Sequence, residues 1–286
     1  MIMDPGSTAP ENCESHGTRG SKFAIPERSA TEGKSAGRQR AAVHYAIRGD
    51  LRYLSHHDEL RMLTRALVRA RWPLAWSEGF NPQPRVNVVL PRRVGTASEC
   101  QLAIVDLSGL HESGALLAQL TATLPSGCVA IGVDAAIGPG TPHPVSAVYA
   151  VELGGDDAQT ASKAMESILA HAQLEVTRES GPDRPPRTID IRRFVEAIWM
   201  EGDVLYMRLT FDGQQSARPS EVTTCMGLAP ERTEHRVRRV EVRWDKDWTA
   251  ASRDAGVRER NTLGEEEDGA LDDDARSAED RGKEDN

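Results

Sequence analysis

The chain is poor in several residue types on which metalloproteins and redox proteins depend. It has four cysteines in 286 residues, and the spacing of Cys13, Cys100, Cys128 and Cys225 fits neither a zinc knuckle nor a redox pair. A C-x-x-x-C-x-x-C run is absent, so the chain cannot by itself hold the iron–sulfur cluster that such a run binds. Scattered cysteines of this kind are typical of the reducing cytosol, and we expect a cytoplasmic protein.

Long hydrophobic runs and nucleotide-binding motifs are also missing. No segment has the length and apolarity of a membrane span, and the polar N-terminal residues contain no signal-peptide core, so we expect no membrane contact. Neither G-x-x-x-x-G-K-[ST] nor G-x-G-x-x-G occurs, and no residues form a Ser-His-Asp or Cys-His catalytic set. The sequence therefore predicts no cofactor and no metal ion, and it assigns no catalytic residue.

Apolar residues are scarce at the two ends of the chain. They make up 38% of the whole, which is low for a fully globular protein. Residues 1–40 are rich in Gly, Ser, Pro, Glu and Arg, and residues 249–286 carry a dense acidic run at 265–268 and 272–274. Such segments cannot bury enough apolar surface to offset chain entropy, so we expect both ends to be disordered.

A basic stretch is hidden within the net charge of −9. From Arg38 to Gly95 there are eleven arginines and only four acidic residues. The folded part can therefore present a basic face, although the chain as a whole is acidic.

The clearest local signal is a helix start at Ser55. Asp58 follows three residues later, which predicts a helix capped by the Ser55 side chain and favoured by the nearby acid. The predicted helix covers residues 55–71, with an apolar side at Leu60, Leu63 and Leu67. A second stripe, which we call the arginine stripe, consists of Arg61, Arg65 and Arg69.

Two histidines lie at this helix start. Consecutive side chains point in different directions, so His56 and His57 cannot both join Asp58 at one metal ion without ligands from elsewhere. We favour helix capping and local packing for these residues. The alternative is a functional His56 that reaches an anion at the helix N-terminus, where free N–H groups favour negative charge.

A stiff loop follows at residues 76–84, here called the Phe80 loop. Gly79 permits a positive φ, while Pro82 and Pro84 fix their own φ and restrict the residues before them. Such a loop suits a binding site, and we expect Asn81 to contact a ligand. For Phe80 we favour a place in the core beneath the turn over stacking on a base.

The remaining pattern predicts an α+β protein made of two halves. They cover residues 41–137 and 148–248, and a Pro/Gly-rich linker at 138–147 joins them. Predicted strands lie at residues 43–54 (interrupted by a turn at 49–50), 72–76, 85–90, 101–107, 128–134, 148–153, 174–178, 194–200, 204–211 and 236–244. Predicted helices lie at 55–71, 112–124, 157–172 and 221–226. Each half follows the ferredoxin-like β-α-β-β-α-β order, and we expect the two halves to pack as one core.

Three short motifs also carry a resemblance to a known family. They read LRYLSHHD (residues 51–58), SEGFNPQP (77–84) and LPRRVGTAS (90–98). In this order they resemble the domain of unknown function linked to radical-SAM proteins (DUF2344-type). The likeness extends over about residues 42–244 and is looser in the second half. Arg92 and Arg93 depart from the family pattern and make the third motif more basic. The resemblance implies a radical-SAM enzyme acting in trans, or an RNase E/G-type ribonuclease, as partner.

These observations give three functional hypotheses. The first is a non-catalytic module that binds RNA or phosphate and presents a substrate to the partner enzyme. The second is a metal-independent RNA-processing endonuclease that uses His56, by fold-level analogy. The third is a protein-binding adaptor.

The first hypothesis has two sets of candidate contacts. Nucleic acid would be contacted by Arg61, Arg65, Arg69, Arg92 and Arg93, and a smaller anion by Ser55, His56, Asp58, Asn81 and Arg85. We further expect His56 and Asn81 to meet at one rim of a small sheet and to form a preformed anion pocket there.

Overall fold

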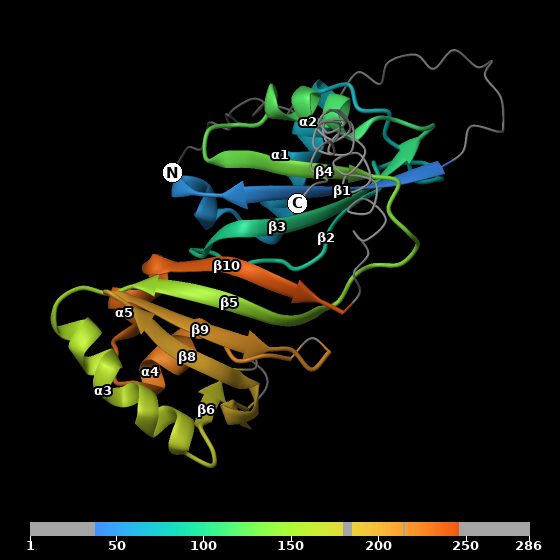
Figure 1. Cartoon of the computed structure of the whole chain (residues 1–286). Coiled ribbons are helices and arrows are strands. Elements are labelled where there is room, and N and C mark those ends of the chain that lie inside the picture. Colours follow the sequence, from blue (N-terminus) through green and yellow to red (C-terminus); the bar gives the residue numbers. More distant parts are fainter. Residues whose placement is uncertain (1–37, 180–184, 214, 246–286) are drawn as a thin grey trace, which may run out of the picture. The chain divides into compact units, whose positions relative to one another are not determined.

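The computed structural model describes residues 38–179, 185–213 and 215–245 (Figure 1). The segments predicted to be disordered therefore lie outside the described residues, apart from residues 38–40, which begin the first strand. The fold is α+β, as the sequence predicts.

The first half follows the predicted order of strands and helices. Its elements are β1 (Arg38–Ile47), the 3-10 turn η1 (Gly49–Tyr53), α1 (His56–Arg69), β2 (Val86–Val88), β3 (Ala97–Ser108), α2 (Ser113–Thr121) and β4 (Cys128–Ala135). β1 pairs antiparallel with β3 and β4, and β2 pairs antiparallel with β3, which gives the order β4-β1-β3-β2. The strand predicted at residues 72–76 forms only isolated bridges, at Leu74 and Trp76.

The second half repeats this order with an inserted hairpin. Its elements are β5 (Pro144–Glu152), α3 (Asp156–Ala170), β6 (Glu175–Arg178), β7 (Arg187–Asp190), η2 (Arg192–Phe194), β8 (Val195–Glu201), β9 (Val204–Thr210), α4 (Pro219–Cys225), α5 (Pro230–Thr233), η3 (Glu234–Arg236) and β10 (Val237–Trp244). Antiparallel pairing gives the order β10-β5-β9-β8. β6 and β7 pair only with each other, and β5 begins inside the stretch predicted to be a linker.

The two halves share one mixed, eight-stranded sheet because β3 and β10 lie side by side (Figure 1). Their pairing is parallel and brings Arg238 opposite Ala97 and Arg239 opposite Ser98. β2 has only three residues and covers β3 from Ala103 to Val105, so the first residues of β3 remain open for β10.

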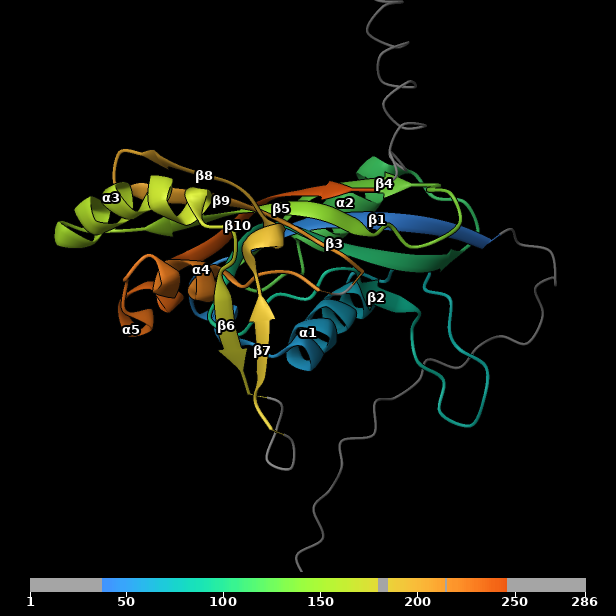
Figure 2. The same cartoon turned by 90° about the horizontal axis from the view of Figure 1, so that it is seen from below.

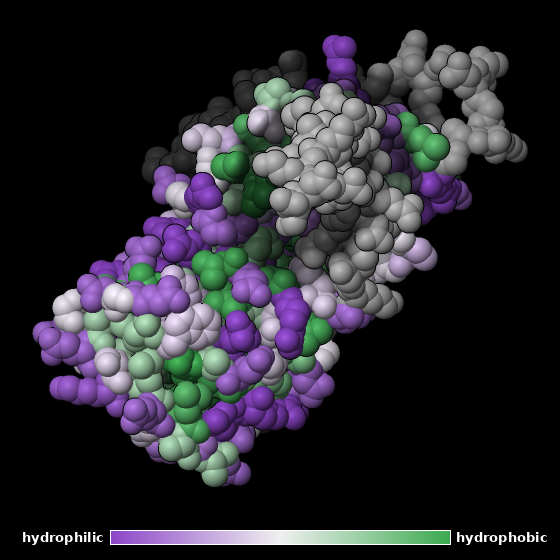
Figure 3. Space-filling model, viewed as in Figure 1, coloured by the Kyte–Doolittle hydropathy of each residue, from purple (hydrophilic) through white to green (hydrophobic). Residues whose placement is uncertain are grey.

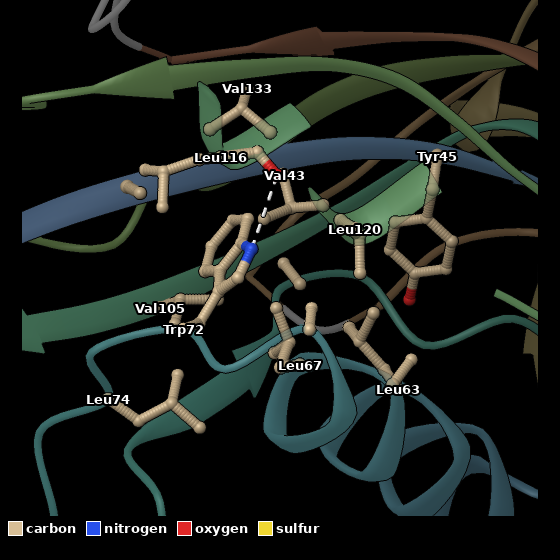
Figure 4. Packing of buried hydrophobic residues seen from close by; sticks show 14 of the residues in the cluster. Val43, Tyr45, Leu63, Leu67, Trp72, Leu74, Val105, Leu116, Leu120 and Val133 are labelled. Carbon is tan, nitrogen blue, oxygen red and sulfur yellow. Dashed lines mark hydrogen bonds between the residues drawn. The ribbon is translucent and has the colours of Figure 1, made fainter. Parts of the chain in front are cut away.

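In the first half, α1 and α2 pack on one face of the sheet (Figures 2 and 4). Leu67 of α1 and Leu116 of α2 lie beside the buried ring of Trp72, and Leu63 of α1 lies in the same cluster on the side of Tyr45. The indole N–H of Trp72 donates to the carbonyl of Leu116 at 3.2 Å, which ties the segment after α1 to α2 (Figure 4).

The second half has a core of its own. Ala161 and Ile168 of α3 and Val222 of α4 pack against Leu205 and Met207 of β9. The buried apolar side chains thus form a separate cluster in each half, and the predicted single core is wrong. The reason is that the helices of each half cover their own strands, while the buried polar residues Ser98 and Arg239 pair at the junction of β3 and β10.

The other face of the first half is apolar in part. Ala42, Leu102 and Ile104 form a small buried group there, and Trp244 from the end of β10 packs against it. Figure 3 shows apolar patches that are divided by polar side chains on this side of the molecule. None of the helices in the described ranges is long and apolar enough to span a membrane.

Candidate functional site

The start of α1 has the predicted cap. The backbone N–H of Asp58 donates to Oγ of Ser55 at 3.2 Å, and the Ser55 hydroxyl donates to Oδ2 of Asp58 at 2.7 Å. Nη1 of Arg61 lies 3.3 Å from the other carboxylate oxygen of Asp58. The hydrogen bond from Ser55, and after it the charge of Arg61, hold the pKa of Asp58 below its ordinary value. Ser55 and Asp58 are therefore paired with each other, and a ligand contact at either stays a prediction.

His56 is half-buried beside the exposed His57, and the centroids of the two rings are 5.7 Å apart. Nδ1 of His56 is buried and has no hydrogen-bond partner among the described residues. A catalytic histidine is usually oriented by a second group, and the described residues provide none at this atom. Within the same ranges, no three His, Cys, Asp or Glu side chains are grouped so that they could hold a metal ion.

The Phe80 loop is closed at its base. Trp76 and Pro84 form an isolated bridge. The backbone N–H of Ser77 donates to the carbonyl of Gln83 at 2.8 Å, and the N–H of Gln83 donates to Oγ of Ser77 at 2.9 Å. These reciprocal bonds fix the base of the loop, and the stiffness that its prolines predict stays a prediction.

At the tip of this loop, Phe80 has a relative exposure of 111%, so the prediction that it lies in the core is wrong. The loop projects beyond its own bridged base, and its tip therefore has no core beneath it. Asn81 is exposed as well, and its side-chain oxygen accepts a hydrogen bond from Nε2 of Gln83 at 3.3 Å.

His56 and Asn81 belong to opposite ends of β1. His56 follows η1, which comes after Ile47 at the end of β1. The Phe80 loop is attached by backbone hydrogen bonds to Asp106, which pairs with Arg40 near the start of β1. Ile47 lies seven positions after Arg40 along β1, which corresponds to roughly 23 Å of strand. The predicted pocket shared by His56 and Asn81 is therefore wrong, because α1 carries the chain back across the sheet before the loop begins.

The arginine stripe is exposed along α1, as predicted. Arg61 pairs with Asp58, and Nη2 of Arg69 donates to the carbonyl of Thr123 at 2.8 Å. In the part of the chain that the structure describes, Arg65 has no hydrogen-bond or ion-pair partner. Figure 2 shows α1 and the loop that precedes β2 on the same side of the sheet. Arg85, at the base of that loop, is also exposed.

Arg92 does not lie on this surface, so its predicted contact with nucleic acid is wrong. Its side chain is 1% exposed, and its Nε lies 2.9 Å from Oε2 of Glu59, whose side chain is equally buried. The guanidinium also donates to four backbone carbonyls, those of Leu51, Arg52, Leu54 and Thr96. Arg93, the next residue, is exposed.

Glu59 is the centre of a buried network that consists of Tyr45, Glu59, Arg92, Gln101 and Arg239. Oε1 of Glu59 accepts from the Tyr45 hydroxyl at 2.9 Å and from Nε2 of Gln101 at 2.5 Å. Gln101 in turn accepts from the guanidinium of Arg239. Burial, and after it the charge of Glu59, raise the pKa of Tyr45 well above its ordinary value, so Tyr45 stays a neutral donor. The network joins β1, α1, the segment at residues 90–96, β3 and β10.

The first sequence motif (residues 51–58) and the third (90–98) are therefore in contact, because the Arg92 guanidinium of the third donates hydrogen bonds to backbone carbonyls of the first. Residues 40–219 match the family described as an uncharacterized protein conserved in bacteria (DUF2344). The chain belongs to this family. A search of curated proteins found no match. The matched stretch ends at the start of α4, and the central strand β10 lies beyond it.

In this DUF2344 protein, the third motif also approaches the second half through Arg93. Burial lowers the pKa of Arg218, and the nearby positive charge of Arg93 lowers it further. Nε and Nη2 of Arg178 bind the two carboxylate oxygens of Glu221, each at 2.7 Å, and Nε of Arg218 lies 3.5 Å from that carboxylate. The guanidiniums of Arg178 and Arg218 thus share the carboxylate of Glu221, and the guanidinium of Arg93 is nearby. The sequence prediction missed this cluster because its members lie far apart in the chain.

Proposed function

We propose that this DUF2344 protein is a non-catalytic module that binds the phosphates of RNA and presents the RNA to a separate enzyme. The observation that carries the proposal is the exposed arginine stripe of α1 on the same side of the sheet as the loop that holds the fully exposed Phe80. Planar guanidinium groups suit phosphate oxygens, and an exposed aromatic ring suits stacking on an unpaired base.

We also infer that each half is a ferredoxin-like unit. The orders β4-β1-β3-β2 and β10-β5-β9-β8, with antiparallel neighbours and the β6–β7 hairpin as an insertion, support this inference. A fold alone assigns no function, so the functional proposal rests on the exposed side chains and not on the topology.

For the partner enzyme we propose a radical-SAM protein acting in trans or an RNase E/G-like ribonuclease, on the strength of the family resemblance. The chain has no C-x-x-x-C-x-x-C run of its own, which favours an iron–sulfur cluster on a separate chain. The free thiols of Cys100, Cys128 and Cys225 support a cytoplasmic location.

The test measures binding of a labelled single-stranded RNA by fluorescence anisotropy at low and at high salt. We expect affinity to fall with salt, because arginines that bind phosphates release counterions from the RNA. The triple variant R61A/R65A/R69A should bind more weakly, and its salt slope should fall by about one for each phosphate that the variant no longer binds. Phe80→Ala should lose roughly 1–3 kcal/mol of binding free energy if the ring stacks on a base.

The matched control is K163A/R187A/R243A, which removes three positive charges from exposed residues outside the first half. An equal loss in both triple variants would mean that net charge alone drives binding. Unchanged binding in the stripe variant would refute the proposed surface. Cleavage of the RNA in the same mixture would favour the endonuclease hypothesis instead.

A further inference from the structure

A cleft of about 720 Å³ opens where the two halves meet, beside the first residues of β3 and β10. Its size lies within the range of small-molecule sites. Both halves contribute to its lining, the first through η1 and Ala97, the second through Leu153 and Val237. This junction cleft lies at the end of β1 opposite to the attachment of the Phe80 loop.

Arginines dominate the charge of the junction cleft. Its charged lining residues are Arg48, Arg52, Arg236, Arg238, Glu99 and Glu152, and His235 joins them. Arg48 binds both carboxylate oxygens of Glu99, and Nη1 of Arg238 lies 3.8 Å from Oε1 of Glu152. The two carboxylates therefore balance two of the four arginines, and two positive charges remain.

The remaining charges belong to Arg52 and Arg236, one from each half. Neither pairs with a carboxylate among the described residues: Nη1 of Arg52 donates to the carbonyl of His235 at 2.9 Å, and Nη1 of Arg236 lies 3.5 Å from the carbonyl of Glu152. The Nε–H groups of Arg52 and Arg238 are buried, and no described residue accepts from either. A buried donor without an acceptor in the protein can be completed by a bound ligand, ion or water.

Arg52 is held in place by the buried network. Its carbonyl accepts hydrogen bonds from the guanidinium of Arg92 and from the backbone N–H of Gly95, the latter at 2.9 Å. Its own guanidinium lies 5.0 Å from the centre of the Tyr53 ring. The Arg52 guanidinium lines the cleft, and the backbone of Arg52 is already held by Arg92, which pairs with Glu59. Ligand binding therefore requires less ordering of Arg52.

We propose that the junction cleft binds a phosphomonoester dianion, held between Arg52 and Arg236. Guanidinium groups bind phosphate oxygens through paired, charge-assisted hydrogen bonds. A phosphomonoester carries close to two negative charges at neutral pH, which matches the two uncompensated arginines. The proposal goes beyond RNA backbone binding on the arginine stripe, because it assigns a second site that recognises a terminal phosphate. A free mononucleotide and the 5′ end of an RNA both carry this group.

The first experiment titrates the full chain with adenosine 5′-monophosphate and with adenosine by isothermal titration calorimetry. We expect the monophosphate to bind and the nucleoside to give no signal. Arg236→Ala and Arg52→Ala should each weaken binding by about tenfold or more, as expected when a charged hydrogen bond is removed. Arg243→Ala, at the other end of β10, and the triple stripe variant should leave the affinity for the monophosphate unchanged.

A second arm compares two RNAs of one sequence, one with a 5′-phosphate and one with a 5′-hydroxyl. Tighter binding of the phosphorylated RNA that disappears in Arg236→Ala identifies the RNA end as a source of the ligand, whereas binding of the mononucleotide alone identifies the free compound. The proposal would be overturned if the mononucleotide did not bind and the 5′-phosphate gave no gain in RNA affinity. It would also be overturned if the monophosphate and adenosine bound equally, or if a folded Arg236→Ala variant kept full affinity. Loss of RNA binding in the stripe variant with monophosphate binding retained would show that the two sites are independent.

Discussion

Replacing Arg92 with methionine should strongly destabilise the first half. Methionine keeps a long apolar side chain but removes the ion pair with Glu59 and the donors to four backbone carbonyls. Glu59 would then be a buried carboxylate to which, among the described residues, only the neutral donors Tyr45 and Gln101 still donate. Loss of one partner from a buried ion pair destabilises a protein by about 3–5 kcal/mol.

For a domain of this size, such a loss lowers the melting temperature by roughly 6–20 °C. The free energy of unfolding can be measured by urea titration, with intrinsic fluorescence as the readout, since Trp72 is buried in the core of the first half. Arg93→Met is the matched control, because it changes an exposed arginine next to Arg92 in the chain. It should alter stability by no more than about 0.5 kcal/mol.

A double-mutant cycle tests the ion pair itself. Glu59→Gln alone should also destabilise the protein, because it leaves the Arg92 charge buried without a counter-charge. The double variant E59Q/R92M should lose less than the sum of the two single losses, by roughly 0.5–3 kcal/mol. Strictly additive losses, or equal unfolding midpoints for Arg92→Met and Arg93→Met, would refute the assignment of Arg92 to a buried pair.

Three further predictions concern single residues. Ser55→Ala should raise the pKa of Asp58, since the Ser55 hydroxyl is the main group that lowers it. An unchanged pKa of Asp58 in an NMR pH titration would contradict the cap. The stabilising effect of ionised Asp58 is present above its unfolded-state pKa and is lost as the pH falls through the lower folded-state pKa. Burial, followed by the charge of Glu59, raises the pKa of Cys128 to about 12, so iodoacetamide should modify this thiol at mildly alkaline pH only after unfolding, as mapped by mass spectrometry. Gly127→Ala should destabilise the protein by more than about 1 kcal/mol in urea titration, because Gly127 has φ +86° and the new Cβ would lie 2.8 Å from the carbonyl oxygen of Arg48. The control is Gly114→Ala in the first turn of α2, where a Cβ meets no atom within 4 Å, and it should not be destabilising.

Local features of α1 could be predicted because they depend on neighbours in the sequence. The Ser55 cap needs only Asp58 three residues away, and the exposure of the arginine stripe follows from helical spacing against Leu63 and Leu67. The stiffness expected of the Phe80 loop is also a local property, because it depends on the prolines and the glycine of the loop itself. Whether the loop tip packs or projects depends on what lies beneath it, and that information is not local.

The buried network has one local signal in the sequence, which is the position of Glu59. This residue stands four residues before Leu63, on the apolar side of α1, and a charge at such a position requires a partner. The identity of the partner could not be read, because Arg92 and Arg93 are adjacent and look alike. Only the path of the chain beneath the sheet directs one guanidinium inward and the other to solvent.

The place of β10 has a consequence for how the protein is made. This strand lies near the C-terminal end of the described residues, yet it stands in the middle of the sheet between β3 and β5. While the chain is being synthesised, the edges of β3 and β5 therefore lack their neighbour until residues 237–244 have left the ribosome. Exposed strand edges are sites where chains pair wrongly with one another. Closure of the sheet depends on contacts between distant residues, such as Ala97 and Arg238, so we expect slow folding and a nascent chain that is prone to aggregate until β10 is in place.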